Sequence, residues 1–84
     1  MNEKVLLNLC KRMVIEHYNR YIREDEKPII NIKDVYILEK RNSSDCITEI
    51  SLKVNSYTDL EYVVVYDSKA EDGKKISGYT IFTL

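Results

Sequence analysis

The stretch LEYVVVYD at residues 60–67 decides the fold, because it combines strong β propensity with apolar residues on both sides of a strand's alternation. Glu61 and Asp67 fall on the same side, and their charges mark that side as the outer face. Val63 and Val65 lie on this outer side too, so something other than the main core has to cover their apolar side chains. The opposite set predicts the buried face and consists of Leu60, Tyr62, Val64 and Tyr66.

The residues before this strand give the clearest strand pattern in the chain. In CITEISLKVN, residues 46–55, apolar positions alternate with Glu49, Ser51 and Lys53, which predicts one buried and one solvent-facing side. Two more strands are predicted at 35–41 and 76–83. Their buried faces stay open, because apolar residues occupy both sides: Val35 and Ile37 against Tyr36 and Leu38, and Ile76 and Phe82 against Tyr79 and Ile81.

Residues 2–23 carry the period of an amphipathic helix of about six turns. Ile15 and Ile22 lie at the margin of its polar side and predict a small secondary contact ridge. Pro28 disfavours helical geometry at the residue before it, and NIKD at 31–34 predicts a capped turn. The positions predicted to face the core are Leu6, Leu9, Cys10, Met13, Val14, His17, Tyr18 and Tyr21.

These elements predict one α+β domain that spans residues 1–84. Short polar connections favour antiparallel neighbours, so we expect a long N-terminal helix packed on a four-stranded antiparallel meander in the order α-β-β-β-β. A chain of 84 residues suffices for a single core.

Composition and charge weigh against several function classes. A net charge of −1 leaves no basic field that would attract nucleic acid, and the only two glycines, Gly73 and Gly78, belong to the last hairpin rather than to a phosphate-binding loop. No stretch predicts an export signal or a membrane span. We therefore expect a cytoplasmic protein, with its two cysteines as reduced thiols.

The residues that could carry chemistry form no recognisable catalytic or metal-binding set. The single histidine, His17, lies on the apolar face of the predicted helix, where we expect one ring nitrogen to be hydrogen-bonded. Cys10 lies about 10 Å from it along the helix axis, too far to share a tetrahedral metal site. We expect no enzyme, no metal and no cofactor. The enzymatic alternative is a nucleophile pair of Cys46 and His17.

One helix covers only one face of a sheet, so apolar residues on the other face predict a contact surface. We expect a second copy of the chain or a partner protein to cover the outer face or an open edge strand, and we expect a homodimer. The alternative is that a long loop or the curled end of the sheet covers these residues. The predicted contact residues are Tyr36, Val63, Val65 and Tyr79, with Glu61 and Asp67 at the rim.

The segment CKRMVIEHYNRYI at residues 10–22, with the polar turn at 31–34 and DVYIL at 34–38, resembles a family of small proteins encoded by bacteriophages and prophages. In that family a helix bearing Cys-Lys and Tyr-Asn leads to a polar turn and an Asp-Val-Tyr-Val strand. The likeness covers about the first 40 residues, and the family's aromatic-rich middle is not matched afterwards. The resemblance implies a phage accessory protein in the cytoplasm of a bacterial host cell and transfers no catalytic residues.

Small phage proteins without enzymatic residues often act by occupying the surface of a host protein. The resemblance therefore implies a protein that binds and inhibits or modulates a host protein, for example as an anti-defence protein directed at CRISPR interference. The alternative function is a small-ligand binder that sequesters a nucleotide-like signal, either between helix and sheet or at a dimer cleft.

Overall fold

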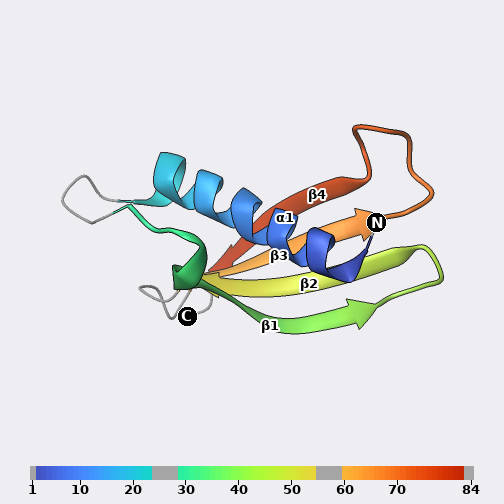
Figure 1. The fold of residues 1–84 in the computed structure, drawn as a ribbon, viewed down its shortest axis with the longest axis horizontal. Coiled ribbons are helices and arrows are strands. Elements are labelled where there is room, and N and C mark those ends of the chain that lie inside the picture. Colours follow the sequence, from blue (N-terminus) through green and yellow to red (C-terminus); the bar gives the residue numbers. More distant parts are fainter. Residues whose placement is uncertain (1, 24–28, 55–59, 83–84) are drawn as a thin grey trace.

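The structure is a computed structural model that describes residues 2–23, 29–54 and 60–82, apart from the side chains of residues 60 and 79–82. Its strands form one antiparallel sheet in the order β1-β2-β3-β4, and α1 lies across one face of it (Figure 1). The predicted α+β fold is therefore confirmed. The elements are α1 (Glu3–His17), the π-helical turn η1 (Tyr18–Ile22), the 3-10 turn η2 (Ile32–Asp34), β1 (Val35–Asn42), β2 (Ile47–Val54), β3 (Leu60–Asp67) and β4 (Ile76–Phe82).

Short polar side chains set the start of α1 and of β1. The side-chain oxygen of Asn2 accepts a hydrogen bond from the backbone N–H of Val5 at 3.0 Å, which caps α1. The turn predicted at 31–34 is confirmed as a capping box. Asn31 accepts from the N–H of Lys33 at 3.3 Å, and the Asp34 carboxylate accepts from the N–H of Asn31 at 2.8 Å. This turn leads directly into β1.

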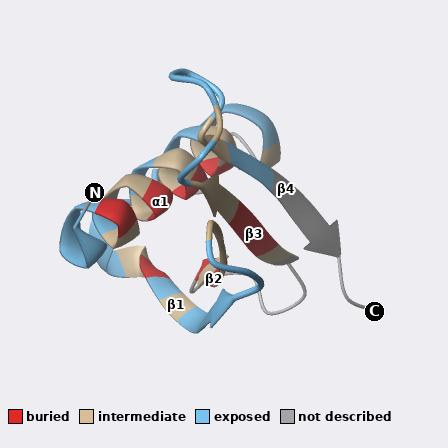
Figure 2. Cartoon of the chain, turned by 90° about the vertical axis from the view of Figure 1, so that its right-hand side faces the viewer, coloured by how far each residue is buried: buried red, intermediate tan, exposed pale blue. Residues whose placement is uncertain are grey.

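The core lies between α1 and the sheet (Figure 2). The alternation predicted for β2 is confirmed, because Ile50, Leu52 and Val54 are all 0% exposed. On β3, Tyr62 and Val64 face the helix as predicted and are 4% and 2% exposed. The other buried members of this core are Leu6, Cys10, Val14, Tyr18, Ile30 and Val35.

Strand β1, whose buried face the sequence left open, turns Val35 and Ile37 toward the core. Tyr36 lies on the other side and is 44% exposed. The pairing with β2 shifts between Ile37 and Glu39, so Leu38 forms a bulge and is 46% exposed. A bulge on an edge strand disrupts the ladder, which protects this edge from indiscriminate pairing with another strand.

The helix departs from the prediction at its last turn. The N–H of Arg23 donates to the carbonyl of Tyr18 at 2.8 Å, five residues back, so each residue of η1 advances by less than the 100° of an α-helix. The predicted core position of Tyr21 is therefore wrong, since its side chain is 66% exposed. Ile15 and Ile22, predicted as a marginal ridge, both pack against the core.

Asn19 fixes the point at which the chain returns to the sheet after the helix. Its side-chain amide donates to the carbonyl of Ile30 at 3.2 Å, and its oxygen accepts from the N–H of Ile30 at 3.1 Å. The two bonds hold Ile30, which is 5% exposed, in the core.

Candidate functional site

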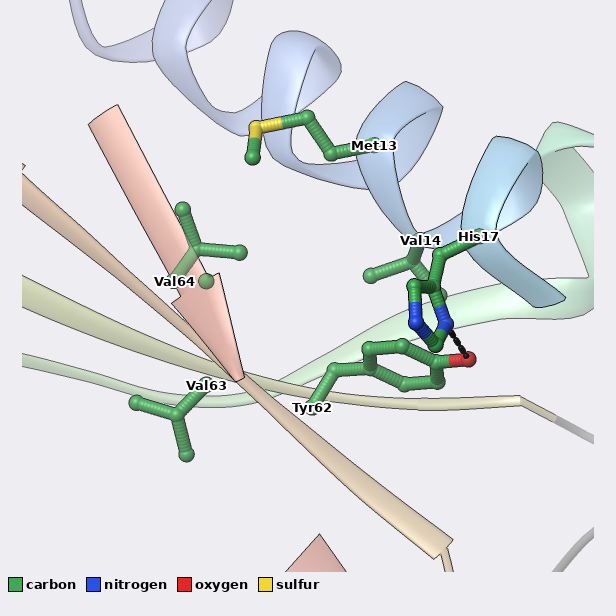
Figure 3. A pocket seen from close by; sticks show the side chains of 7 residues that line it. Met13, Val14, His17, Tyr62, Val63 and Val64 are labelled. Carbon is green, nitrogen blue, oxygen red and sulfur yellow. Dashed lines mark hydrogen bonds between the residues drawn. The ribbon is translucent and has the colours of Figure 1, made fainter. Parts of the chain in front are cut away.

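A cleft opens between α1 and the strands β3 and β4 (Figure 3). It exists because residue 78 of β4 is a glycine. A Cβ at Gly78 would lie 3.8 Å from Met13 Cε and 3.8 Å from Val64 Cγ2, so any side chain there would extend into this space. The cleft has a volume of about 350 Å³ and is lined by Met13, Val14, His17, Tyr62, Val63, Val64 and Gly78.

His17 and Tyr62 form the polar end of the cleft. The Nδ1 atom of His17 lies 3.0 Å from the hydroxyl oxygen of Tyr62, and the two rings meet edge to face with centroids 5.5 Å apart. The predicted hydrogen-bonded ring nitrogen of His17 is thus confirmed. Burial, with a further contribution from Tyr18, raises the pKa of Tyr62 to about 12. A phenol O–H is more acidic than an imidazole N–H, so the arrangement that chemistry favours has the hydroxyl donating to Nδ1 and the ring proton on Nε2.

A second hollow of about 210 Å³ adjoins the cleft on the surface of α1 and η1, and Met13 and His17 line both spaces. The π turn places Tyr21 here, with its ring 5.0 Å from that of His17. The guanidinium carbon of Arg20 lies 5.9 Å from the centroid of the Tyr21 ring, and its Nη2 atom lies 3.5 Å from a carboxylate oxygen of Glu16. Both ion-paired side chains are well exposed, so their attraction contributes at most about 1 kcal/mol.

The cysteines do not form a nucleophile pair with His17. Cys46 lies in the β1–β2 connection, at the end of the sheet opposite to the point where α1 ends (Figure 1). Its sulfur atom is 3.5 Å from the hydroxyl oxygen of Ser44. Cys10 is completely buried, and this burial raises its pKa to about 11 in spite of a backbone hydrogen bond that lowers it. The geometry therefore does not bring together the groups required by the enzymatic alternative.

The contact residues predicted from the sequence lie outside this cleft, apart from Val63. Figure 3 shows the Val63 side chain pointing away from α1, on the outer side of the sheet as predicted. Val63 is nevertheless only 6% exposed and offers little area to a partner. Tyr36 is 44% exposed, while Glu61, Val65 and Asp67 are half-buried. Tyr79 pairs with Val63 in the sheet register, and its side chain lies outside the described part of the structure.

Sequence reasoning did not identify the cleft residues as a site. The available signal was Gly78, since an isolated glycine inside a strand often marks a place where another group approaches closely. Its position opposite Met13 depends on the crossing of α1 over the sheet, which no local pattern specifies.

The chain matches no known family model, no curated protein and no solved structure. Within residues 2–23, 29–54 and 60–82, no three His, Cys, Asp or Glu side chains are placed to hold a metal ion. None of the helices in these ranges has the length and hydropathy needed to cross a bilayer.

Proposed function

We propose that this protein is a non-enzymatic phage or prophage accessory protein that binds a host protein and inhibits or modulates it. A component of a bacterial defence system such as CRISPR interference is the type of target that fits this function. The observation that carries the proposal is a set of three exposed apolar side chains on β1 and the turn before it. Ile32, Tyr36 and Leu38 are 46%, 44% and 46% exposed.

These three residues, here called the β1 patch, offer a contact surface at one border of the sheet. Tyr36 and Leu38 are two positions apart on a strand, which places them about 7 Å from each other. Tyrosine is enriched among the residues that dominate binding energy, because its ring is large and its hydroxyl retains a hydrogen bond. The bulge at Leu38 opposes simple strand addition at this edge, so recognition here is by side chains.

The β1 patch is tested with the double variant Tyr36→Ser/Leu38→Ser. The double variant is expected to weaken binding of the host partner by at least about 30-fold, since the loss of a single dominant side chain costs about 2 kcal/mol. The measurement is co-purification from phage-host lysate followed by titration of the captured protein. Val5→Ala is the matched control, because Val5 is 53% exposed but lies on α1. Equal binding by the double variant and the wild type would exclude the β1 patch.

Self-association through the outer sheet face is tested with Val65→Lys. Val65 is half-buried on that face and pairs with Glu49 of β2 and Ser77 of β4. A lysine opposite Glu49 is compatible with the sheet but places a charge where the proposed contact has an apolar side chain. We expect the wild type to sediment as a homodimer and the variant as a monomer. Sedimentation of the wild type as a monomer at tens of micromolar would rule out the homodimer.

The cleft favours a second candidate function, sequestration of a small ligand. Its volume of about 350 Å³ falls within the range of small-molecule sites, and its apolar lining is combined with one polar end. This function predicts that a metabolite, such as a nucleotide signal, raises the unfolding temperature of the protein.

A further inference from the structure

We infer that the cleft beside His17 binds a small planar aromatic carboxylate. The inference rests on the second candidate function, for which it names the ligand class. It is independent of the β1 patch, because no residue of that patch lines the cleft.

The walls of the cleft suit a flat apolar ring. Met13 from α1 and Val64 from β3 face each other across it, and Gly78 leaves the space between them open (Figure 3). The ring of Tyr62 closes one end. Aromatic rings pack well against thioethers and against the edges of other rings, so these groups favour an aromatic over a flexible aliphatic ligand.

His17 supplies a directed hydrogen-bond donor to this space. Its Nδ1 atom lies 3.0 Å from the Tyr62 hydroxyl oxygen. With the more acidic phenol hydroxyl as the donor, the ring proton lies on Nε2. Figure 3 shows this second nitrogen turned toward the open space beneath α1. Among the described residues, Nε2 has no hydrogen-bond partner. A ligand in the cleft therefore gains a bond if it carries an acceptor at the polar end.

The adjoining hollow contains a positive charge that would favour a negatively charged acceptor. Arg20 is the one lysine or arginine among the described residues that line the two spaces, and its partner Glu16 is held only by an exposed ion pair at 3.5 Å. A ligand carboxylate can replace Glu16 beside Arg20, because breaking an exposed ion pair costs at most about 1 kcal/mol of free energy. One guanidinium matches one carboxylate, whereas a nucleotide brings phosphates that carry more charge.

The test uses indole-3-acetate as the probe, titrated into the isotope-labelled protein and followed by amide NMR shifts. We expect saturable shifts at the cleft residues. Indole, which has no carboxylate, and cyclohexylacetate, which has no planar ring, should each bind at least about 5-fold more weakly, since each lacks one of the two recognised groups. Equal affinity for all three probes would overturn the inference.

Two exposed residues give opposite expected effects. Arg20→Gln should weaken indole-3-acetate binding by about 2- to 5-fold, while Glu16→Gln should tighten it by a similar factor because a competing carboxylate is lost. Both side chains are more than 60% exposed, so neither change threatens the fold. A tightening that fails to appear, or an Arg20 variant that binds like the wild type, contradicts the assigned carboxylate position.

A side chain at residue 78 provides the blocking variant. Gly78→Val should abolish binding, because the added methyl groups extend toward Met13 and Val64. Ser77→Val is the matched control, since it adds the same side chain one position earlier on β4, where alternation turns it to the other face. Binding of adenosine monophosphate but not of indole-3-acetate would overturn the ligand class and leave ligand sequestration standing. If neither adenosine monophosphate nor indole-3-acetate binds, both the ligand class and the ligand-sequestration function are contradicted.

Discussion

Replacement of Leu52 by alanine is expected to lower the free energy of unfolding by about 3–4 kcal/mol. Leu52 is 0% exposed and belongs to β2, which has a strand on each side. It pairs with Ile37 of β1 and with Tyr62 of β3, so its side chain lies at the centre of the layer beneath α1. Truncation removes apolar contacts and leaves a cavity that the surrounding strands cannot close.

This loss is large for a domain of 84 residues, whose total stability is expected to be about 4–13 kcal/mol. Each kcal/mol corresponds to about 4–8 °C, so the melting temperature should fall by about 12–32 °C. Urea unfolding followed by circular dichroism measures the effect. Leu38→Ala is the matched control on the neighbouring strand, because Leu38 is 46% exposed and should lose less than about 1 kcal/mol. Similar losses for both leucines would contradict the assigned core.

Raising the pH from 9 to above 12 is expected to destabilise the fold by about 5 kcal/mol through two buried groups. Burial raises the pKa of Cys10 from its ordinary value of 9.0 to about 11. Burial, followed by the effect of Tyr18, raises the pKa of Tyr62 from 10.0 to about 12. Each shift corresponds to about 3 kcal/mol between the two protonation states.

The sign follows from which state binds the proton more tightly. Both pKa values are higher in the folded chain, so the folded state retains its protons where the unfolded state has lost them. The contribution of Cys10 is complete below pH 9 and disappears as the pH rises through about 11. That of Tyr62 is complete below pH 10 and disappears as the pH rises through about 12.

Urea midpoints measured from pH 8 to 12 test this dependence. The variant Cys10→Ala should show a flatter profile between pH 9 and 11 while it keeps the loss at higher pH that comes from Tyr62. An unchanged slope in that variant would show that Cys10 does not titrate as a buried thiol.

The features predicted from the sequence are those that short-range patterns determine. Alternation identifies the buried face of β2, the helical period identifies Leu6, Cys10 and Val14, and short polar residues identify the capped turn before β1. Each of these depends on neighbours a few residues away, and the fold class follows from them.

The unpredicted features depend on how the elements meet. The π turn moves Tyr21 out of the core and lets Ile22 pack against it, and the regular helical period does not predict this turn. The burial of Val63 also depends on how the elements meet. Its side chain faces away from the helix and is still only 6% exposed (Figure 3). The cleft also requires the crossing of α1 over β3 and β4, so His17 could be predicted as a packed residue but not as part of a site.

Gly78 indicates that the chain is not optimised for stability alone. A glycine inside a strand costs about 0.5–1 kcal/mol relative to alanine, and a Cβ at this position would meet its neighbours at ordinary contact distances of 3.5–3.8 Å. A larger residue would therefore strengthen the strand and fill an apolar void at once. The open space beside Gly78 therefore coincides with a cost to the strand of about 0.5–1 kcal/mol, which ligand binding at the proposed site in the cleft would offset.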